Sequence, residues 1–239
     1  MISIVVCAEE KCHLVHHETQ DYFEEAQKMI TCDVDIHFNL EYHQKPYNEP
    51  YKMDVVCDDP ASRFYNLLPF LNVSNFESVE ELWVTNCELP ELYSMLQENF
   101  PKLRCLDLVE ISLPKKFFNI ETKLEEISVS EVKEIEIENL SLFRMPELKK
   151  IALTGIENNL FPLVLKKDAL ADMPHLTHVL VYRCSIKMLP ETLFTNSTNI
   201  RQIDFFNNDI THIPNTLFTN FTELQTIDIR GNKITSIDL

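Results

Sequence analysis

Apolar residues recur along the chain at intervals of about 24 residues. In residues 200–213 and again in residues 224–237, apolar residues and one asparagine stand in the same order. The apolar positions alternate over a short stretch of each segment, which predicts a strand with one buried face. In this frame the segments start at Val79, Leu103, Leu124, Leu148, Leu176, Ile200 and Leu224, at spacings of 24, 21, 24, 28, 24 and 24 residues. A nearly constant period of this length predicts stacked turns that bury their apolar faces against one another.

The two clearest segments read L-x-x-L-x-L-x-x-N-x-L-x-x-L, with isoleucine or phenylalanine at some leucine positions, which is the pattern of a leucine-rich repeat. We therefore expect an α/β solenoid, a leucine-rich repeat horseshoe with short parallel strands on its concave face. Asn208 and Asn232 would point inward and form a hydrogen-bonded ladder between turns. Cys87 and Cys184 stand at the same repeat position, so we interpret them as small buried residues that replace the ladder asparagine. The segment between strands at residues 156–172 is long and predicts a bulge or a change in curvature.

The repeats divide the chain into an N-terminal cysteine-containing cap, residues 1–72, and seven leucine-rich repeats, residues 73–239, of which the last is truncated. A solenoid needs such a cap because its end exposes an apolar edge. Residues 1–8 resemble the end of a partial signal peptide, and the alternative is an ordinary buried first strand. Since the chain stops within a repeat, we expect it to be a fragment of a longer protein.

Composition narrows the functional classes further. Gly155 and Gly231 are the only glycines, which excludes the glycine-rich loops that hold phosphates and dinucleotides. The net charge is −17, from 21 Lys and Arg against 38 Asp and Glu, which opposes nucleic acid and anionic lipid and favours basic partners. No stretch has the ~20 apolar residues of a membrane helix, so we expect no membrane span within this chain.

The repeat pattern does not bring together residues that could support catalysis or bind a metal ion. The segment from Cys12 to His17 holds one cysteine and three histidines, but no second ligand pair follows at zinc-finger spacing. The repeat positions place no nucleophile beside a general base. We therefore expect no metal, no cofactor and no enzymatic activity.

Four N-x-S/T sequons indicate candidate glycosylation sites, at Asn72, Asn139, Asn196 and Asn220. Asn196 and Asn220 are 24 residues apart and share one repeat position. The chain has seven cysteines, an odd number that leaves at least one unpaired, and their spacing alone does not assign partners. The in-phase sequons and the cysteine-containing cap favour the secretory pathway. So does the motif L-P-x-x-L-F, which occurs at residues 189–194 and, with isoleucine first, at 213–218, because it is typical of extracellular repeats.

The sequence resembles the extracellular N-terminal region of insect Toll receptors. The resemblance rests on Cys32, Phe38-Asn-Leu40 and Val55-Val-Cys57 in the cap, on residues 82–90, and on the L-P-x-x-L-F repeats. It implies part of an ectodomain of an innate immune or developmental receptor that binds a Spätzle-like cystine-knot cytokine. It also implies an extracellular or cell-surface location, a single-pass membrane protein as the parent, and possible receptor dimerisation. Cap disulfides would involve Cys12, Cys32 and Cys57, with Cys32–Cys57 as the best single pair.

In a leucine-rich solenoid, the strand positions between the inward residues face the concave surface. In the first three repeats these positions carry seven acidic residues and one basic residue, whereas in the last four they sum to +3. We expect the acidic part to bind a basic protein ligand, with Trp83 as an anchor. The candidate residues are Glu80, Glu81, Trp83, Thr85, Asp107, Glu125 and Glu126. The alternative is that these charges are simply solvated and that Trp83 packs against the cap.

A second candidate contact is an outward-facing apolar patch of Leu180, Tyr182 and Phe206 on adjacent turns. Exposed apolar clusters often mark protein contacts. The alternative is a lateral contact between the patch and a neighbouring loop of the chain.

Two other functions fit the same repeats. One is a secreted leucine-rich repeat protein that acts as a decoy or an adhesion module without its own signalling domain. The other is an intracellular leucine-rich repeat adaptor with reduced cysteines, in which the sequons are accidental.

Overall fold

The structure is a computed structural model, and it describes residues 12–16, 27–32, 36–42, 50–57, 76–88, 96, 98–111, 122–131, 145–156 and 163–237. The chain forms two compact units, Met1–Ile111 and Ser112–Leu239. Each unit is described by itself below. Residues 1–8, Asn72, Asn139 and part of the predicted irregular segment, residues 157–162, lie outside the described residues.

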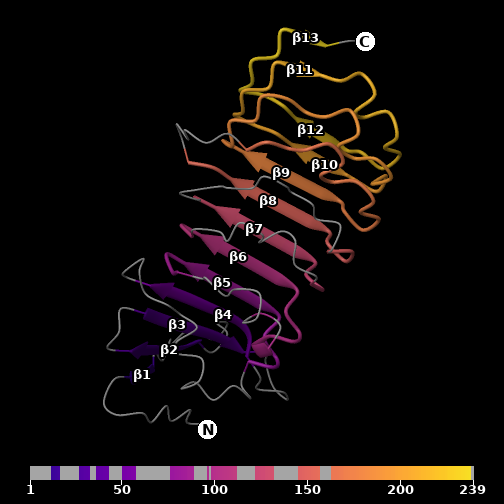
Figure 1. The fold of residues 1–239 in the computed structure, drawn as a ribbon. Helices are drawn as coiled ribbons and strands as arrows, with labels where there is room; N and C mark the ends of the chain where they lie inside the picture. Colours follow the sequence, from indigo (N-terminus) through magenta and orange to yellow (C-terminus); the bar gives the residue numbers. More distant parts are fainter. Residues whose placement is uncertain are drawn as a thin grey trace. The chain divides into compact units, whose positions relative to one another are not determined.

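The first unit holds six strands of one sheet (Figure 1). They are β1 (Cys12–His16), β2 (Gln27–Cys32), β3 (Ile36–Tyr42), β4 (Pro50–Cys57), β5 (Glu81–Thr85) and β6 (Cys105–Val109). Strands β1 to β4 pair antiparallel in chain order, and β4, β5 and β6 then pair in parallel. Strand β4 therefore joins the antiparallel cap to the parallel repeat strands.

The second unit is a stack of parallel strands. Its main sheet has the order β7 (Glu126–Ser130), β8 (Lys150–Thr154), β9 (His178–Tyr182), β10 (Gln202–Asp204) and β12 (Thr226–Asp228). Strands β11 (His212–Ile213) and β13 (Ser236–Ile237) form a second parallel pair. Turns at residues 191–196 and 215–220 return the chain to the next strand. This is the parallel-strand solenoid of a leucine-rich repeat fold, as predicted.

Strands β5 to β10 alternate between buried and more exposed residues as the sequence frame requires, whereas on β12 the predicted inward residue Ile227 is 41% exposed. Each begins two residues after one of the predicted repeat starts, from Val79 to Leu224. On β5, Leu82 and Val84 are fully buried while Trp83 between them is exposed. On β8, Ile151 and Leu153 are buried in the same way. The cores of the two units are therefore built from the predicted inward positions.

A left-handed backbone conformation follows the strands at one repeat position. The residues with positive φ there are Asn86, Glu110, Glu131, Arg183, Asn207 and Gly231. Several of their backbone N–H groups donate to a carbonyl of the following turn, such as Asn86 to Val109 at 2.9 Å and Asn207 to Arg230 at 3.0 Å. Each such bond connects two turns, and it helps to hold non-glycine residues in a conformation that costs roughly 1–3 kcal/mol. The chain therefore turns here with very few glycines.

Gly155 occupies the same repeat position for a different reason. Its N–H also donates to the following turn, at 2.9 Å from the carbonyl oxygen of Tyr182. A Cβ atom on Gly155 would lie 2.2 Å from the carbonyl oxygen of Arg183. Close approach of two backbones, and not a positive φ, requires glycine at this position.

The predicted asparagine ladder is present in the second unit. The Asn208 amide oxygen accepts from the N–H groups of Cys184 and Ile186 at 3.0 and 3.2 Å, and its nitrogen donates to Val181 and Phe205 carbonyls at 2.7 and 3.1 Å. Asn232 repeats the arrangement one turn later, accepting from Ile210 N–H at 3.0 Å. These bonds satisfy backbone groups that would otherwise be buried without partners.

Cys184 fills the ladder position as predicted. Its side chain is completely buried, and its Sγ lies 3.1 Å from the Tyr182 carbonyl oxygen and 3.7 Å from that of Leu153. Burial raises the pKa of the thiol to about 12, so the sulfur keeps the proton that it donates.

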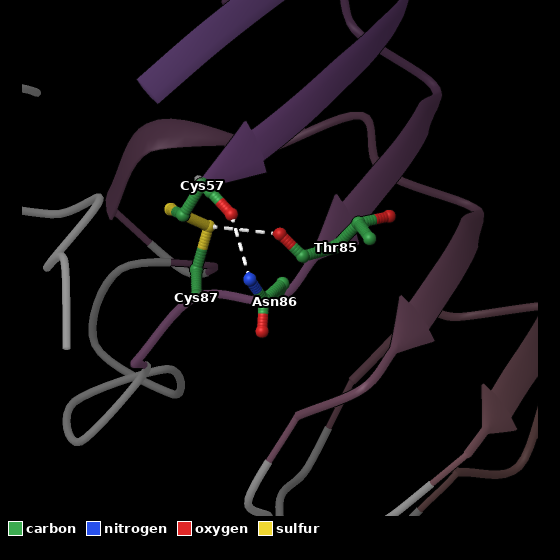
Figure 2. The surroundings of a disulfide bond; sticks show 4 residues. All are labelled: Cys57, Thr85, Asn86 and Cys87. Atoms are coloured by element: carbon green, nitrogen blue, oxygen red, sulfur yellow. Dashed lines mark hydrogen bonds between the residues drawn. A yellow bond between two sulfur atoms is a disulfide. The ribbon is translucent and has the colours of Figure 1, made fainter. Parts of the chain in front are cut away.

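Cys87 corrects two predictions. It is buried, but it forms a disulfide with Cys57 at the end of β4, so it is not a ladder residue (Figure 2). Because Cys57 has this partner, the expected Cys32–Cys57 pair is wrong. The Thr85 carbonyl oxygen lies 3.3 Å from Cys87 Sγ, but this is a contact only, since a disulfide sulfur carries no proton. The nearby Asn86 amide donates to the Cys57 carbonyl oxygen at 2.9 Å and also holds the two strand ends together.

Cys12 and Cys32 are described only by their backbones, and Cys7 lies outside the described residues. Cys12 on β1 and Cys32 on β2 are register partners in the antiparallel pair. Their side chains lie outside the described residues, so their predicted participation in disulfides stays a prediction.

Candidate protein-binding faces

Trp83 lies at the centre of the outward face of the β4–β5–β6 sheet. Its indole is 44% exposed. The register places Asp54 of β4 on one side of it and Asp107 of β6 on the other. An aromatic side chain between two carboxylates offers a partner both apolar area and negative charge. We call this surface, with the strand residues beside it, the Trp83 face.

One side of the Trp83 ring is covered by Lys52 of β4. The ammonium nitrogen lies 4.0 Å from the ring centroid, within the range of a cation–π contact. The same nitrogen is 3.8 Å from the Asp54 carboxylate. Trp83 therefore packs against the cap, as in the alternative interpretation, and still keeps an exposed surface. The sequence did not reveal Lys52, because its position depends on the pairing of β4 with β5.

The other residues predicted for this face lie around Trp83. Glu81 is the register partner of Lys52 and Thr85 that of Val56, which is 40% exposed. Glu80 precedes β5, and its carboxylate is 3.5 Å from the guanidinium of Arg104. The face therefore combines apolar side chains with acidic ones that are partly balanced by bases.

Glu125 and Glu126 belong to the second unit, so they are described apart from Trp83. They form ion pairs with Lys149 and Lys150, at 2.7 and 3.5 Å. In both pairs the acid and the base stand 24 residues apart, at one repeat position in adjacent turns. The repeat period was the signal that could have predicted these pairs. They reduce the acidity expected for this part of the surface.

The second predicted patch, Leu180, Tyr182 and Phe206, lies on one face of the second unit, and all three side chains are half-buried. Leu180 of β9 is the register partner of Asp204 on β10. The pKa of Tyr182 is raised to about 12, first by burial and then by the charge of Asp204 and the hydrogen bond to it. The Tyr182 hydroxyl therefore stays protonated at neutral pH. The patch is thus polar as well as aromatic.

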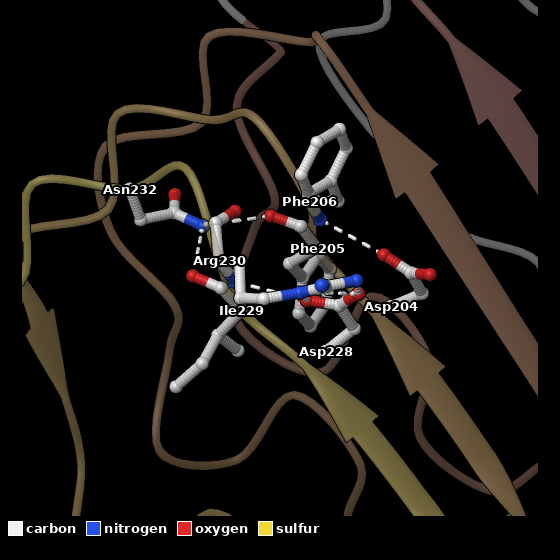
Figure 3. Close-up of polar contacts among 7 residues, drawn as sticks. All are labelled: Asp204, Phe205, Phe206, Asp228, Ile229, Arg230 and Asn232. Atoms are coloured by element: carbon white, nitrogen blue, oxygen red, sulfur yellow. Dashed lines mark hydrogen bonds and ion pairs between the residues drawn. The ribbon is translucent and has the colours of Figure 1, made fainter.

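Arg230 adjoins this patch from the next turn (Figure 3). Its Nε lies 3.0 and 3.1 Å from the two carboxylate oxygens of Asp228, and an Nη bonds the same carboxylate. Its guanidinium carbon is 5.8 Å from the ring centroid of Phe206. The side-chain and backbone hydrogen bonds from Arg230 lower the pKa of Asp228 to about 2. Asp228 is therefore ionised at neutral pH.

The two sequons within the described residues lie in exposed turns. Asn196 ends the turn at residues 191–196, and Asn220 ends the matching turn at residues 215–220. The Asn196 amide nitrogen donates to the Asp172 carboxylate at 2.7 Å. A glycan at either asparagine would project from the turns and not from the strands that carry the two candidate faces.

Two other features are absent from the described residues. No helix among them is long and apolar enough to cross a membrane. No group of three or more His, Cys, Asp or Glu side chains in this part of the chain is arranged to hold a metal ion.

Comparison with known proteins supports the fold. Residues 174–234 match the leucine-rich repeat family model. No curated protein sequence matches the chain significantly. The structure is similar to a chain of the Drosophila Toll–Spätzle complex in its glycosylated form, at 14% identity and a TM-score of 0.52. The similarity covers 98% of this chain and 46% of that chain, so this chain spans less than half the length of the one it matches.

A second structure of the Toll–Spätzle complex matches 92% of this chain and 47% of that chain at 15% identity, with a TM-score of only 0.29. Residues 174–234 thus match the leucine-rich repeat family, and the fold of the chain is similar to that of the first of these two Toll–Spätzle chains.

Proposed function

We propose that this chain is a ligand-binding part of a Toll-type receptor ectodomain, which recognises a Spätzle-like cystine-knot protein through the Trp83 face. The observation that carries the proposal is the 44% exposure of Trp83 at the centre of a sheet face, between Asp54 and Asp107. Tryptophan is enriched among the residues that dominate binding energy at protein interfaces.

Charge supports a basic ligand. The net charge of the chain is −17, and Glu81, Asp107 and Asp54 surround the indole. Acidic residues at the edge of an interface accelerate association with a basic partner. Lys52 already covers one side of the ring, so a ligand would contact the side that remains exposed.

An extracellular location agrees with two features. The Cys57–Cys87 disulfide is typical of an oxidising compartment, and Asn196 and Asn220 are exposed. We extend the proposal to a single-pass membrane parent, to receptor dimerisation, and to a role in innate immunity or development. Ligand recognition in this proposal requires no catalysis and no cofactor.

The test replaces Trp83 by Ala and measures affinity for a processed Spätzle-type cytokine by surface plasmon resonance. We expect the dissociation constant to rise about 30-fold or more, as for a central interface residue. The matched control is Met188→Ala, because Met188 is an apolar residue that is 75% exposed and lies outside the Trp83 face. The control should bind like the unchanged chain, and both variants should keep the unfolding temperature. If Trp83→Ala bound the cytokine with the same affinity as the unchanged chain, this face would not be the binding site.

Charge reversal is a second test of the same site. Replacing Glu80 and Glu81 by Lys should slow association and weaken its dependence on salt, because steering charges act mainly on the association rate. Glu191→Lys is a control of the same chemistry, since Glu191 is exposed in a turn of the second unit. If both substitutions slowed association equally, total charge and not this face would be responsible.

The compartment can be tested independently of the ligand. When the chain is expressed through a secretory pathway, the intact mass before and after glycan removal should show glycans at Asn196 and Asn220. Cys57 and Cys87 should also resist alkylation without reductant. Bare sequons together with fully alkylated thiols would instead favour the intracellular adaptor.

A further inference from the structure

Three side chains of the second unit stand at one repeat position on consecutive turns: Tyr182, Phe206 and Arg230. Beside them, at the position two residues earlier, stand Leu180, Asp204 and Asp228, which are register partners across β9, β10 and β12. The face therefore has a row of two aromatic rings and a cation next to a row with two carboxylates.

Asp204 is held by the backbone of its own turn. One of its carboxylate oxygens accepts from the Phe206 N–H at 2.9 Å. Asp228 accepts from the Arg230 N–H at 3.0 Å in the matching way. The carboxylates are thus held in place by the turns, so their positions do not depend on the guanidinium of Arg230.

Arg230 makes the contacts that an arginine from a partner would make. Its guanidinium binds Asp228 through two nitrogens and lies 5.8 Å from the centre of the Phe206 ring (Figure 3). A planar guanidinium suits both a carboxylate and an aromatic face, whereas a lysine ammonium suits the pair less well. The site is therefore chemically selective for arginine.

The Arg230 side chain is 80% exposed. Exposed ion pairs contribute little to stability, because water screens them and ordering the side chains costs entropy. Moving Arg230 aside would therefore cost little, and it would leave Asp228, Asp204 and the Phe206 ring open to a second guanidinium.

We propose that this face of the second unit is a docking surface for an arginine-bearing protein segment, and that Arg230 occupies the arginine site until a partner displaces it. Charge complementarity specifies the partner. The surface offers two carboxylates held by the turns, two aromatic rings and one displaceable internal cation, and these suit a guanidinium from the partner. The surface is separate from the Trp83 face, so either proposal can fail without the other.

The experiment titrates the whole chain with a tetra-arginine peptide and follows backbone amide shifts by NMR. Because the chain is acidic overall, the peptide will also bind elsewhere, so the readout is restricted to the amides of Phe206, Asp228 and residue 230. We expect Arg230→Ala to tighten binding at these amides about threefold to tenfold, since it removes the internal competitor.

The matched control is Arg201→Ala, which removes one positive charge from an exposed residue on the same unit. It should change binding at these amides much less than Arg230→Ala does. Asp204→Asn should weaken binding, and a tetra-lysine peptide should bind less tightly than tetra-arginine. Three results would each overturn the proposal: equal effects of Arg230→Ala and Arg201→Ala, weaker binding in Arg230→Ala, or a tetra-glutamate peptide that binds here and needs Arg230.

Discussion

Replacing Asn208 by Ala tests whether the ladder holds adjacent turns together. The side chain is 5% exposed and makes hydrogen bonds to Cys184, Ile186, Val181 and Phe205. Alanine keeps the backbone but has no group that can replace these bonds. The substitution therefore leaves buried backbone groups of the preceding turn without a partner.

The expected loss of stability follows from the backbone groups that have no other hydrogen-bond partner when Asn208 is replaced. The Phe205 carbonyl oxygen also accepts from Asn232 at 2.8 Å, so it keeps a partner. Three bonds remain, to two N–H groups and one carbonyl. At about 1 kcal/mol for each, the free energy of unfolding should fall by about 3 kcal/mol.

Two assays measure this effect at different scales. Urea unfolding reports the total loss, with Asn215→Ala as a control at an exposed turn. Hydrogen exchange should accelerate at the amides of Cys184 and Ile186, the two donors to Asn208. In Asn232→Ala the accelerated amide should instead be Ile210. The reasoning would be refuted by a loss below about 1 kcal/mol, or by the same exchange pattern in both variants.

Three further predictions concern other features. Cys87→Ser opens the disulfide to Cys57, which spans 30 residues, and should lower the free energy of unfolding in urea by about 3.5 kcal/mol; reductant should then have little further effect at this site. Gly155→Ala should lower the melting temperature by several degrees, because the added Cβ would lie 2.2 Å from a backbone oxygen, and an unchanged temperature would contradict this. Arg230→Ala should raise the pKa of Asp228 from about 2 toward its ordinary 3.8 in an NMR titration, while the backbone N–H of residue 230 keeps part of the depression. Since the folded-state pKa is depressed, the stabilisation from this carboxylate is present above pH 3.8, is lost as the pH falls toward 2, and should be smaller in the variant.

The repeat strands were predictable because their burial is periodic. Each turn buries residues such as Leu82 and Val84 at fixed positions, so the sequence pattern repeats with the structure. The ladder could be predicted for a related reason: Asn208 and Asn232 occupy one position, and an inward amide there can reach backbone groups of its own turn and of the neighbouring turn.

The disulfide could not be predicted from the same pattern. Cys87 stands at a ladder position, and a buried thiol such as that of Cys184 can serve there without a covalent partner. Whether a cysteine pairs depends on what lies on the preceding turn. In the first unit that turn ends with β4, whose residues 50–57 are not part of the repeat frame, so the proximity of Cys57 becomes visible only once β4 and β5 are paired.

The candidate faces were predicted in part. The alternation of apolar and polar positions along β5 and β9 was sufficient to predict that Trp83 and Tyr182 face outward. The contacts that modify them, Lys52 on Trp83 and Asp204 on Tyr182, join different strands. Cross-strand contacts depend on register and on side-chain conformation, which the composition of a single strand does not specify.

The bonds between turns also bear on how such a chain can change in evolution. From Leu148 to Leu176 the spacing is 28 residues instead of 24, yet Ile151 still pairs with Val179, and the N–H of Gly155 still reaches the next turn. The four additional residues thus fall between that glycine and the next strand, and the register of β8 with β9 is kept. A gene that gains or loses a whole turn would preserve every partner in the remaining turns, whereas one residue inserted within a strand would put all later contacts of that turn out of phase. Natural variation in related genes should therefore concentrate in complete turns and in the segments that return to the next strand.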